Sequence, residues 1–494
     1  YGFRATEYGK RAGCYMARDY ETALVLRGFG GLDQSKDRTL ISYSDSPDCV
    51  NMSTEGGSLR TACGYRRIDA PNVPGGVKSM GAFYRRSDGR EWILCANAGG
   101  IYAWSGDTGG QSQSAWEQIY VPESGKMGEM VDFLNYQDKE NDVVLMADGV
   151  NPVLTWSGSG ESHARKGITQ RFAHIEMNYE RVWGAGAPGE PDTVYWSRQF
   201  DVGDWTGDVS DPDNGGGFLQ APTWNGGKIR LISALFGDIV IFKDQDVLKV
   251  SGTYPGEYQV SRVTGTEGPV AARTVCQWGD KVYFLGRTGL CFYDGMRAQD
   301  AGDRRARKWY ERISESYIEK ACAIVHGHTM YIALPVDGSE ENNCVLEYDM
   351  NRDTIMPRTG INAAHWLEWN GKLLFAGSSG VIYEYGQGTT YDGRPINAYW
   401  ETPTYNMGSS KLTGDRTTKQ LGELTVYGKG RMHILARADE KQKQSEIIMH
   451  TYDKRTRKRL NLRGRRFSLR LSSVDGVSFE LYGSVTIGMD VESD

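Results

Sequence analysis

The feature that most constrains this sequence is a repeated two-strand pattern. From residue 92 onward, an apolar stretch, a glycine-containing turn and a second stretch ending in an aromatic residue recur along the chain. The clearest copies are WILCANAGGIYAWSG (92–106), VVLMADGVNPVLTWSG (143–158), VYFLGRTGLCFYDG (282–295) and LLFAGSSGVIYEYG (373–386). Each copy is typical of a β-hairpin, because apolar and aromatic residues favour strands and glycine favours tight turns.

Weaker copies of the hairpin begin near Arg181, Ile239 and Met330, so that seven starting points lie roughly 40 to 60 residues apart, which is the period of propeller blades. A blade can bury its apolar faces only against neighbouring blades, and a closed ring leaves few exposed strand edges. We therefore expect a β-propeller of about seven blades over residues 73–392.

The last hundred residues break this rhythm. The segment RRFSLRLSSVDGVSFELYG (465–483) alternates apolar and polar residues on both sides of an Asp-Gly turn, which predicts a half-buried antiparallel hairpin. Together with the stretches 422–428 and 431–439, it predicts a β-sandwich-like platform domain over residues 393–494. Helix signals are few, and the fairest is ERISESYIEKACAIV, near residue 311.

Residues 1–72 are expected to form an N-terminal arm that packs with the C-terminal domain. The arm contains a turn signal at Gly56 and Gly57, because glycine reaches positive φ without steric cost. The chain has 494 residues, with 62 Gly, 28 Tyr and 13 Trp. This composition supports an all-β fold of two or three domains.

Eight cysteines are spread along the chain without a C-x-x-C pair. If strands pair around the Gly56–Gly57 turn, Cys49 and Cys63 come nearly opposite each other, close enough for a disulfide. We interpret the cysteines as mostly free thiols, which fits assembly in a reducing cytoplasm. The chain starts without Met and shows no leader-like stretch, and no apolar window of about 18 residues predicts a membrane span.

Several motifs suggest ligand sites, and each has a simpler interpretation. Gly184, Gly186 and Gly189 match the dinucleotide pattern G-x-G-x-x-G, but a strand follows where a helix is needed, which favours a blade loop. His326 and His328 are spaced to project from one strand face like metal ligands. No third ligand is near them in sequence, so polar or partly buried histidines are favoured and no metal is expected.

Two further loops are acidic and glycine-rich. DPDNGG (211–216) places Asp211, Asp213 and Asn214 in a partial calcium-loop pattern that lacks the final bidentate Glu, so an Asx-rich turn is favoured. DVGDWTG (201–207) and SGDTGG (105–110) are incomplete matches to the Asp box of sialidase-type propellers.

No nucleophile elbow, H-E-x-x-H helix or P-loop is present in the sequence. A glycosidase carboxylate pair is defined by its separation in space, so the sequence leaves that possibility open. We expect no enzymatic turnover and no cofactor.

The charge is uneven along the chain. Residues 391–494 hold 18 basic and 13 acidic residues (net +5), so residues 1–390 hold 39 and 50 (net −11). The run KRTRKRLNLRGRRFSLR (454–470) has nine basic residues and no acidic one. It can be a solvated strand face, a protein contact or a nucleic-acid contact. We expect subunit or adaptor contacts from Lys458, Arg459, Arg463, Arg465 and Arg466.

Three regions carry a resemblance to a known family. They are the segment GFGGLDQSKDRTLISYSDSPDCVNMSTEGGSLRTACGYRRI (28–68), the stretch VYWSRQFDVGDWTG (194–207), and the run 239–295 from IVIFKDQDVLKVSGTYPG to CFYDG. The late motifs RGRRFSL and DGVSFELYG add to it. With these degenerate motifs the chain resembles the virion β-propeller proteins of bacteriophages, most of all the tail-nozzle family (tail tubular protein B) of short-tailed phages.

The resemblance implies a structural tail protein that forms a homo-oligomeric, hexameric ring through which DNA leaves the capsid. Its implied partners are tail adaptor or portal-proximal proteins, tail fibres and, transiently, double-stranded DNA. Its implied location is the virion, after assembly in the bacterial cytoplasm. The sequence differs from the family in two ways: it lacks the usual short start and the large insertion that forms a tip domain. Because of the second difference, a peripheral position in the tail is also possible.

Two alternatives belong to other functional classes. A receptor- or glycan-binding propeller at the tail tip would use exposed aromatic residues such as Trp104, Trp156 and Trp205. A sialidase-like hydrolase would need clustered arginines and a carboxylate or tyrosine at the propeller centre.

Overall fold

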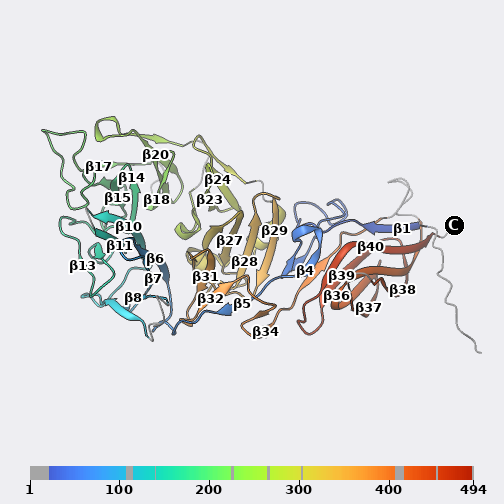
Figure 1. Ribbon diagram of the computed structural model, residues 1–494. Coiled ribbons are helices and arrows are strands. Elements are labelled where there is room, and N and C mark those ends of the chain that lie inside the picture. Colours follow the sequence, from blue (N-terminus) through green and yellow to red (C-terminus); the bar gives the residue numbers. More distant parts are fainter. Residues whose placement is uncertain are drawn as a thin grey trace, which may run out of the picture.

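The chain folds into an elongated all-β molecule with a propeller at one end and a second β domain at the other (Figure 1). The computed structural model describes residues 22–106, 115–138, 141–223, 227–263, 268–301, 304–406, 417–451 and 454–491. In these ranges no helix is both long and apolar enough to cross a membrane. The predicted fold class is confirmed.

Seven sheets form the blades of the propeller, and all their strand pairs are antiparallel except β33 with β5 in the seventh. The first three blades are β6 (Ser79–Arg85), β7 (Arg90–Asn97), β8 (Gly100–Trp104), β9 (Glu117–Tyr120); β10 (Asp132–Asp138), β11 (Asn141–Ala147), β12 (Leu154–Trp156), β13 (His163–Ala164); and β14 (His174–Asn178), β15 (Arg181–Ala185), β16 (Thr193–Trp196), β17 (Gly217–Gln220). The next three are β18 (Ile229–Leu235), β19 (Asp238–Lys243), β20 (Val247–Ser251), β21 (Gln259–Arg262); β22 (Cys276–Trp278), β23 (Lys281–Leu285), β24 (Leu290–Tyr293), β25 (Ala298–Asp300); and β26 (Cys322–His326), β27 (Thr329–Leu334), β28 (Cys344–Asp349), β29 (Thr354–Thr359). The seventh contains β30 (His365–Trp369), β31 (Lys372–Ala376), β32 (Ile382–Tyr385), β5 (Tyr65–Arg67), β33 (Thr390–Tyr391) and β34 (Arg394–Pro395).

All seven predicted hairpins are present, and each forms the two middle strands of a blade. These strands carry long apolar runs because neighbouring blades cover both of their faces. In β15, for example, every residue from Arg181 to Ala185 is buried. The inner and outer strands are more polar, so their sequence signal is weaker.

Shared apolar cores join consecutive blades. Phe83 and Trp92 of the first blade pack on Trp156 of the second, with the two tryptophan ring centroids 5.5 Å apart. The seventh blade packs on the first through residues that include Leu374 and Ile93, which closes the ring. The core between the fifth and sixth blades is continuous with that of the second domain.

The N-terminal segment supplies the closing strand of the propeller. The strand β5 pairs antiparallel with β32 in the seventh blade. Tyr65 on β5 is only 3% exposed, and its ring centroid lies 5.0, 4.9 and 4.8 Å from those of Phe375, Tyr383 and Tyr391. The last blade is therefore completed by residues from the other end of the chain.

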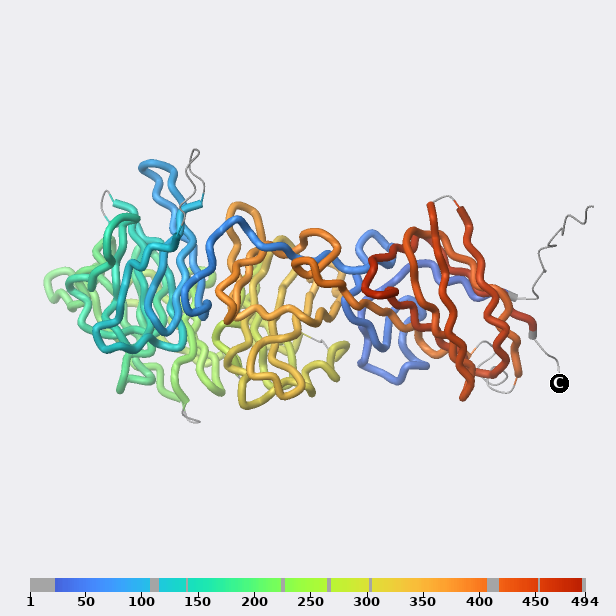
Figure 2. The backbone as a smooth tube through the Cα atoms, turned by 90° about the horizontal axis from the view of Figure 1, so that it is seen from below, coloured from blue at the N-terminus to red at the C-terminus, as the bar shows by residue number. Residues whose placement is uncertain are grey.

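Strands from both chain ends build the second domain, a near-closed antiparallel barrel or sandwich. Figure 2 shows the blue N-terminal strands beside the orange and red C-terminal ones. Its strands are β1 (Thr22–Leu26), β2 (Cys49–Val50), β3 (Met52–Ser53), β4 (Leu59–Thr61), β35 (Tyr399–Glu401), β36 (Lys419–Ala438), β37 (Lys441–Met449), β38 (Thr456–Gly464), β39 (Phe467–Ser473) and β40 (Glu480–Val491).

The long strand β36 organises this domain. It pairs with β38 and β40 along its first half and with β37 and β39 along its second half. Gly430, with φ of 97°, lies near the change of partners. A Cβ there would come within 2.6 Å of the Ser478 carbonyl oxygen, so the close approach requires glycine.

The predicted hairpin over residues 465–483 is wrong in detail. The segment 465–483 contains a turn with positive φ at Asp475 and Gly476, but β39 and β40 do not form a ladder with each other. Each pairs with β36, because β36 is long enough to serve both. The stretch 422–428 and residues 431–438 of the next stretch are parts of that same strand.

The predicted helix near residue 311 is also wrong. Only short helical turns form there, and residues 322–326 form the inner strand β26, because pairing with β27 satisfies their backbone. In the part of the chain that the structure describes, the helical elements are η1 (Glu55–Gly57), η2 (Pro255–Glu257), η3 (Ala272–Thr274), η4 (Arg304–Ala306), α1 (Arg307–Tyr310) and η5 (Glu315–Lys320).

The predicted facing of Cys49 and Cys63 does not occur. The turn at Gly56 and Gly57 joins β3 and β4, but Cys49 lies before β3 and pairs with Trp400 on β35. No disulfide joins any two of the seven cysteines in the described ranges. Burial raises the pKa of the Cys49 thiol to about 12, so it stays protonated.

Candidate functional site

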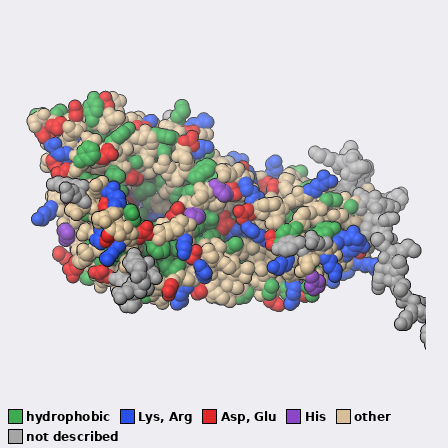
Figure 3. Space-filling view, viewed as in Figure 1, with side chains coloured by type: hydrophobic (Ala, Val, Ile, Leu, Met, Phe, Trp, Pro, Cys, Tyr) green, Lys and Arg blue, Asp and Glu red, His purple; other side chains and the backbone are tan. Residues whose placement is uncertain are grey.

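The basic run forms one exposed strand face at the end of the second domain. On β38, Arg457, Arg459 and Arg463 are exposed, while Leu460 and Leu462 alternate with them and are buried. Lys and Arg side chains gather over β38 in Figure 3. The strand thus anchors the domain through one face and presents positive charge on the other.

Four of the five predicted contact residues lie on this surface. Arg459 and Arg463 project from β38, and Arg465 and Arg466 are exposed in the turn that follows. The backbone N–H groups of Arg465 and Arg466 donate to the Asp439 carboxylate at 2.8 and 2.9 Å, which fixes the turn. Lys458 differs, because it is half-buried and lies opposite Leu424 on the inward face of β38.

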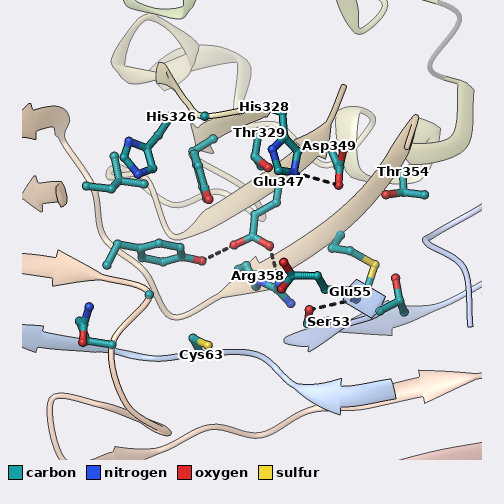
Figure 4. A pocket seen from close by; sticks show the side chains of 18 of the residues that line it. Ser53, Glu55, Cys63, His326, His328, Thr329, Glu347, Asp349, Thr354 and Arg358 are labelled. Atoms are coloured by element: carbon teal, nitrogen blue, oxygen red, sulfur yellow. Dashed lines mark hydrogen bonds and ion pairs between the residues drawn. The ribbon is translucent and has the colours of Figure 1, made fainter. Parts of the chain in front are cut away.

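A cavity of about 470 Å³ lies between the last two blades and the β3–β4 hairpin (Figure 4). At its base, Arg358 on β29 pairs with Glu347 on β28, and Tyr385 donates a hydrogen bond of 2.5 Å to the same carboxylate. Arg358 also donates to the Met52 carbonyl of β3. Although burial disfavours its charge, the adjacent Glu347 raises the pKa of Arg358 above its usual value.

His326 and His328 both line this cavity but do not project from one strand face. His326 ends β26, and His328 follows the turn at Gly327, where φ is 64°. Their nearest carboxylates differ: His326 lies 3.4 Å from Glu368, and His328 lies 3.6 Å from Asp349. Within the described ranges no group of three metal-ligating side chains forms.

A second cavity, of about 500 Å³, opens at the axis of the propeller. Arg273, in the helix η3 before the fifth blade, crosses this axis. It donates to the carbonyls of Lys78 at 2.6 Å, Glu129 at 2.8 Å and Ala364 at 3.5 Å. These acceptors precede the first, second and seventh blades, so one side chain links four parts of the ring.

The positive charge of Arg273 acts on groups inside the protein. Burial lowers the pKa of Arg273. The pKa of His365 is lowered to about 3, mainly by burial and also by the nearby Arg273 charge, which keeps this histidine neutral. The second axial arginine, Arg230, pairs with Asp244 and, at 2.8 Å, with Glu319. Sequence reasoning missed Arg273, because nothing in its local pattern shows that it faces the axis.

We expect Arg273→Met to destabilise the propeller by about 2 kcal/mol, because carbonyls from three blades lose a charged donor. Urea denaturation measures this effect. The control Arg307→Met removes a 62% exposed side chain that pairs only at 3.3 Å with Glu311, and should cost about 0.5 kcal/mol or less. If both variants lose the same free energy of unfolding, the hydrogen bonds of Arg273 at the axis stabilise the propeller no more than an exposed ion pair does.

The acidic loop after β16 is organised by arginine. Arg198 lies 2.9 Å from Asp204, 2.6 Å from Asp208 and 3.6 Å from Asp211. Asn214 donates its side-chain amide to Asp211, which is the Asx-type turn chemistry favoured by the sequence.

The remaining motifs also have structural roles. Gly184 lies inside β15, and strand β16 follows the loop that contains Gly186 and Gly189, as expected for a blade loop. Asp204 caps its own turn through Thr206. Most of the segment 105–110 lies outside the described residues.

The expected exposure of the tryptophans is wrong. Trp104 and Trp156 are 4% and 1% exposed, because both pack between blades. Trp205 is half-buried, its ring centroid lies 5.0 Å from that of Phe172 in a tilted arrangement, and its indole N–H donates to the Val202 carbonyl. These side chains do not form a sugar-stacking surface.

No protein-family model and no curated protein matches the chain. Among solved structures, it is similar to the WD40 domain of Neurospora crassa Pan2, with 11% identity over 66% of this chain and 95% of that one and a TM-score of 0.41. It is similar to BamB from Moraxella catarrhalis, with 10% identity over 73% and 97% and a TM-score of 0.39. A third match is the extracellular domain of the putative one-component system BT4673 from B. thetaiotaomicron, with 11% identity over 85% and 58% and a TM-score of 0.43. These matches are distant and concern the fold alone.

Proposed function

We propose that this chain is a structural subunit of a bacteriophage tail, and that copies of it form a nozzle ring through which DNA is ejected. The observation that carries the proposal is the domain built from both chain ends beside a propeller. A platform of this construction is what the resemblance to tail-nozzle proteins implies. The basic surface of β38 supplies a contact between subunits or with an adaptor.

The conduit for DNA would lie between subunits rather than through each propeller. At six of the seven blade junctions the inner strands pack closely against each other, and Arg273 bridges the remaining axial space. Residues 1–390 carry a net charge of −11, which suits a conduit, because each phosphate contact adds to a salt-dependent affinity that would retain the cargo.

Electron cryo-microscopy of assembled particles tests the proposal. The expected result is a ring of six elongated subunits below the portal, each with a propeller and a β domain of this shape. Particles in which this chain occupies a tail-tip position, or from which it is absent, would contradict the nozzle assignment.

Charge reversal of Arg463, Arg465 and Arg466 to Glu is expected to reduce ring formation at least tenfold while the monomer stays folded. All three side chains are exposed, so the fold loses little, whereas a ring repeats each contact in every subunit. Sedimentation velocity measures assembly, and circular dichroism and thermal melting check the fold.

The matched control reverses three exposed arginines of the propeller and its neighbouring helix, Arg67, Arg90 and Arg307, with the same change in net charge. If the Arg463, Arg465 and Arg466 variant assembles normally but binds less DNA, the surface contacts nucleic acid instead. If neither property changes, the strand face is only solvated.

Neither alternative is supported by the residues that the sequence suggested for it. The aromatic surface expected for glycan binding does not form from Trp104 and Trp156, because both side chains are buried. A sialidase-like reaction would need clustered arginines at the axis. The two described there, Arg230 and Arg273, are held by carboxylates and by backbone carbonyls. We propose that the chain performs no catalysis.

A further inference from the structure

Large apolar side chains are exposed on one end of the propeller, and we call four of them the apolar rim: Tyr179, Phe200, Phe236 and Met296. Their exposed fractions are 41, 67, 66 and 82%. They stand at turns of the third, fourth and fifth blades. Hydrophobic side chains are visible over β17 and β20 in Figure 3.

Contacts between the turns make the rim one continuous surface. The backbone N–H of Phe200 donates to the Glu180 carbonyl at 2.9 Å, and Asn178 donates to the Gly237 carbonyl at 2.7 Å. A Cβ built on Gly237 would lie 2.2 Å from the Tyr179 hydroxyl oxygen, and one on Gly295 would lie 3.5 Å from the Phe236 ring. Contiguous exposed apolar surface of this kind marks interaction sites.

The backbone at these turns is unfavourable for the residues that occupy it. Tyr179, Phe200 and Phe236 have φ of 50, 61 and 52°, in the left-handed region that disfavours bulky side chains. The equivalent first turns of the last three blades use glycine or Asn-Gly, namely Gly279, Gly327 and Asn370–Gly371. Because these aromatic side chains are exposed, they gain little packing to offset the cost of the strained backbone. Their presence therefore indicates a role in binding rather than in folding.

The surroundings of the rim are strongly acidic. Ten acidic and two basic residues, a net charge of −8, lie in the loops 176–180, 197–218, 236–238, 251–258 and 294–297. One of the two basic residues, Arg198, is already surrounded by Asp204, Asp208 and Asp211. An anionic lipid surface or a nucleic acid would be repelled here.

We propose that the apolar rim is a docking site for a basic protein surface, one that inserts apolar side chains among the rings and places Lys or Arg against the acidic loops. The charge complementarity selects the partner, and the aromatic rings supply the buried contact. This inference does not depend on a role in a phage tail.

The test compares the double variant Phe200→Asn/Phe236→Asn with the control Leu40→Asn/Val121→Asn. The control residues are 69 and 63% exposed and lie elsewhere on the molecule. Because Asn tolerates positive φ, the rim variant should melt at the same temperature as the wild type or higher. A clearly lower melting temperature would assign these rings to folding and overturn the proposal.

Binding is measured with a synthetic peptide of alternating Leu and Lys, with its Leu-Glu counterpart as a probe of charge. The wild type and the control should bind the Leu-Lys peptide at least tenfold more tightly than the rim variant does, and salt should weaken that binding. No binding by the wild type, or equal binding by all three proteins, would overturn the proposal. So would binding of phosphatidylglycerol vesicles at the rim, or self-association that the rim variant abolishes.

Discussion

A chain that begins at residue 73 is expected to be recovered unfolded or aggregated, although it contains all seven hairpins that define the propeller. It lacks β5, so the last blade loses its closing strand and β32 exposes an unpaired edge. It also lacks β1, β3 and β4, which pair with β40 or with each other in the second domain. Solubility on expression and far-ultraviolet circular dichroism measure the outcome.

Two substitutions at Tyr65, one large and one small, test how much β5 contributes to stability apart from the other strands that the shortened chain lacks. Tyr65→Ala should cost about 3–5 kcal/mol, because it empties a site packed against three rings. Tyr65→Phe keeps the ring and loses mainly the hydrogen bond that Arg394 donates at 2.8 Å, at a cost of about 1 kcal/mol. A soluble chain from residue 73 with a cooperative melt would show that ring closure does not need β5.

Arg358→Met is expected to cost about 3–5 kcal/mol, because it leaves the Glu347 carboxylate without its charged partner in a mostly buried site. The Arg358 and Glu347 side chains are 5 and 15% exposed. The substitution also removes the bond to the Met52 carbonyl, which links the propeller to the second domain. Urea denaturation, followed by tryptophan fluorescence, measures the loss.

The double variant Arg358→Met/Glu347→Gln provides the control. Removing both charges avoids an unpaired buried carboxylate, so the double variant should recover a large part of the lost stability. If the single and double variants are equally unstable, packing of the arginine stem is responsible rather than the ion pair.

The propeller was predictable from sequence because its middle strands are buried on both faces. Stretches such as those around Trp92 and Trp183 repeat that environment in every blade, and the repeat is visible as periodic apolar runs. The outer strands carry no such repeat, so the position of β5 in the seventh blade was not foreseeable. A three-residue strand from the N-terminal segment has no local sequence pattern that indicates which strand it will pair with.

The surface was predictable only where charge is contiguous in sequence. The run around Arg463 forms one exposed face because a strand and the turn after it keep neighbours together. Arg273 and the apolar rim depend on blades far apart in the chain, and Trp104 and Trp156 were misjudged because the same aromatic residues serve cores and binding surfaces alike. Burial decides between those roles, and burial is a property of the assembled ring.

The pairing of the two chain ends also sets an order of events during synthesis. Thr61 and Phe479 are joined by a hydrogen bond across a sequence separation of 418 residues, and β1 pairs with β40 near the end of the described chain. A ribosome therefore releases the first strands long before their partners exist, and such non-local pairings form slowly. Each nascent chain carries open strand edges until β40 has been synthesised, so chains that grow side by side on one messenger RNA can mispair with each other during that interval.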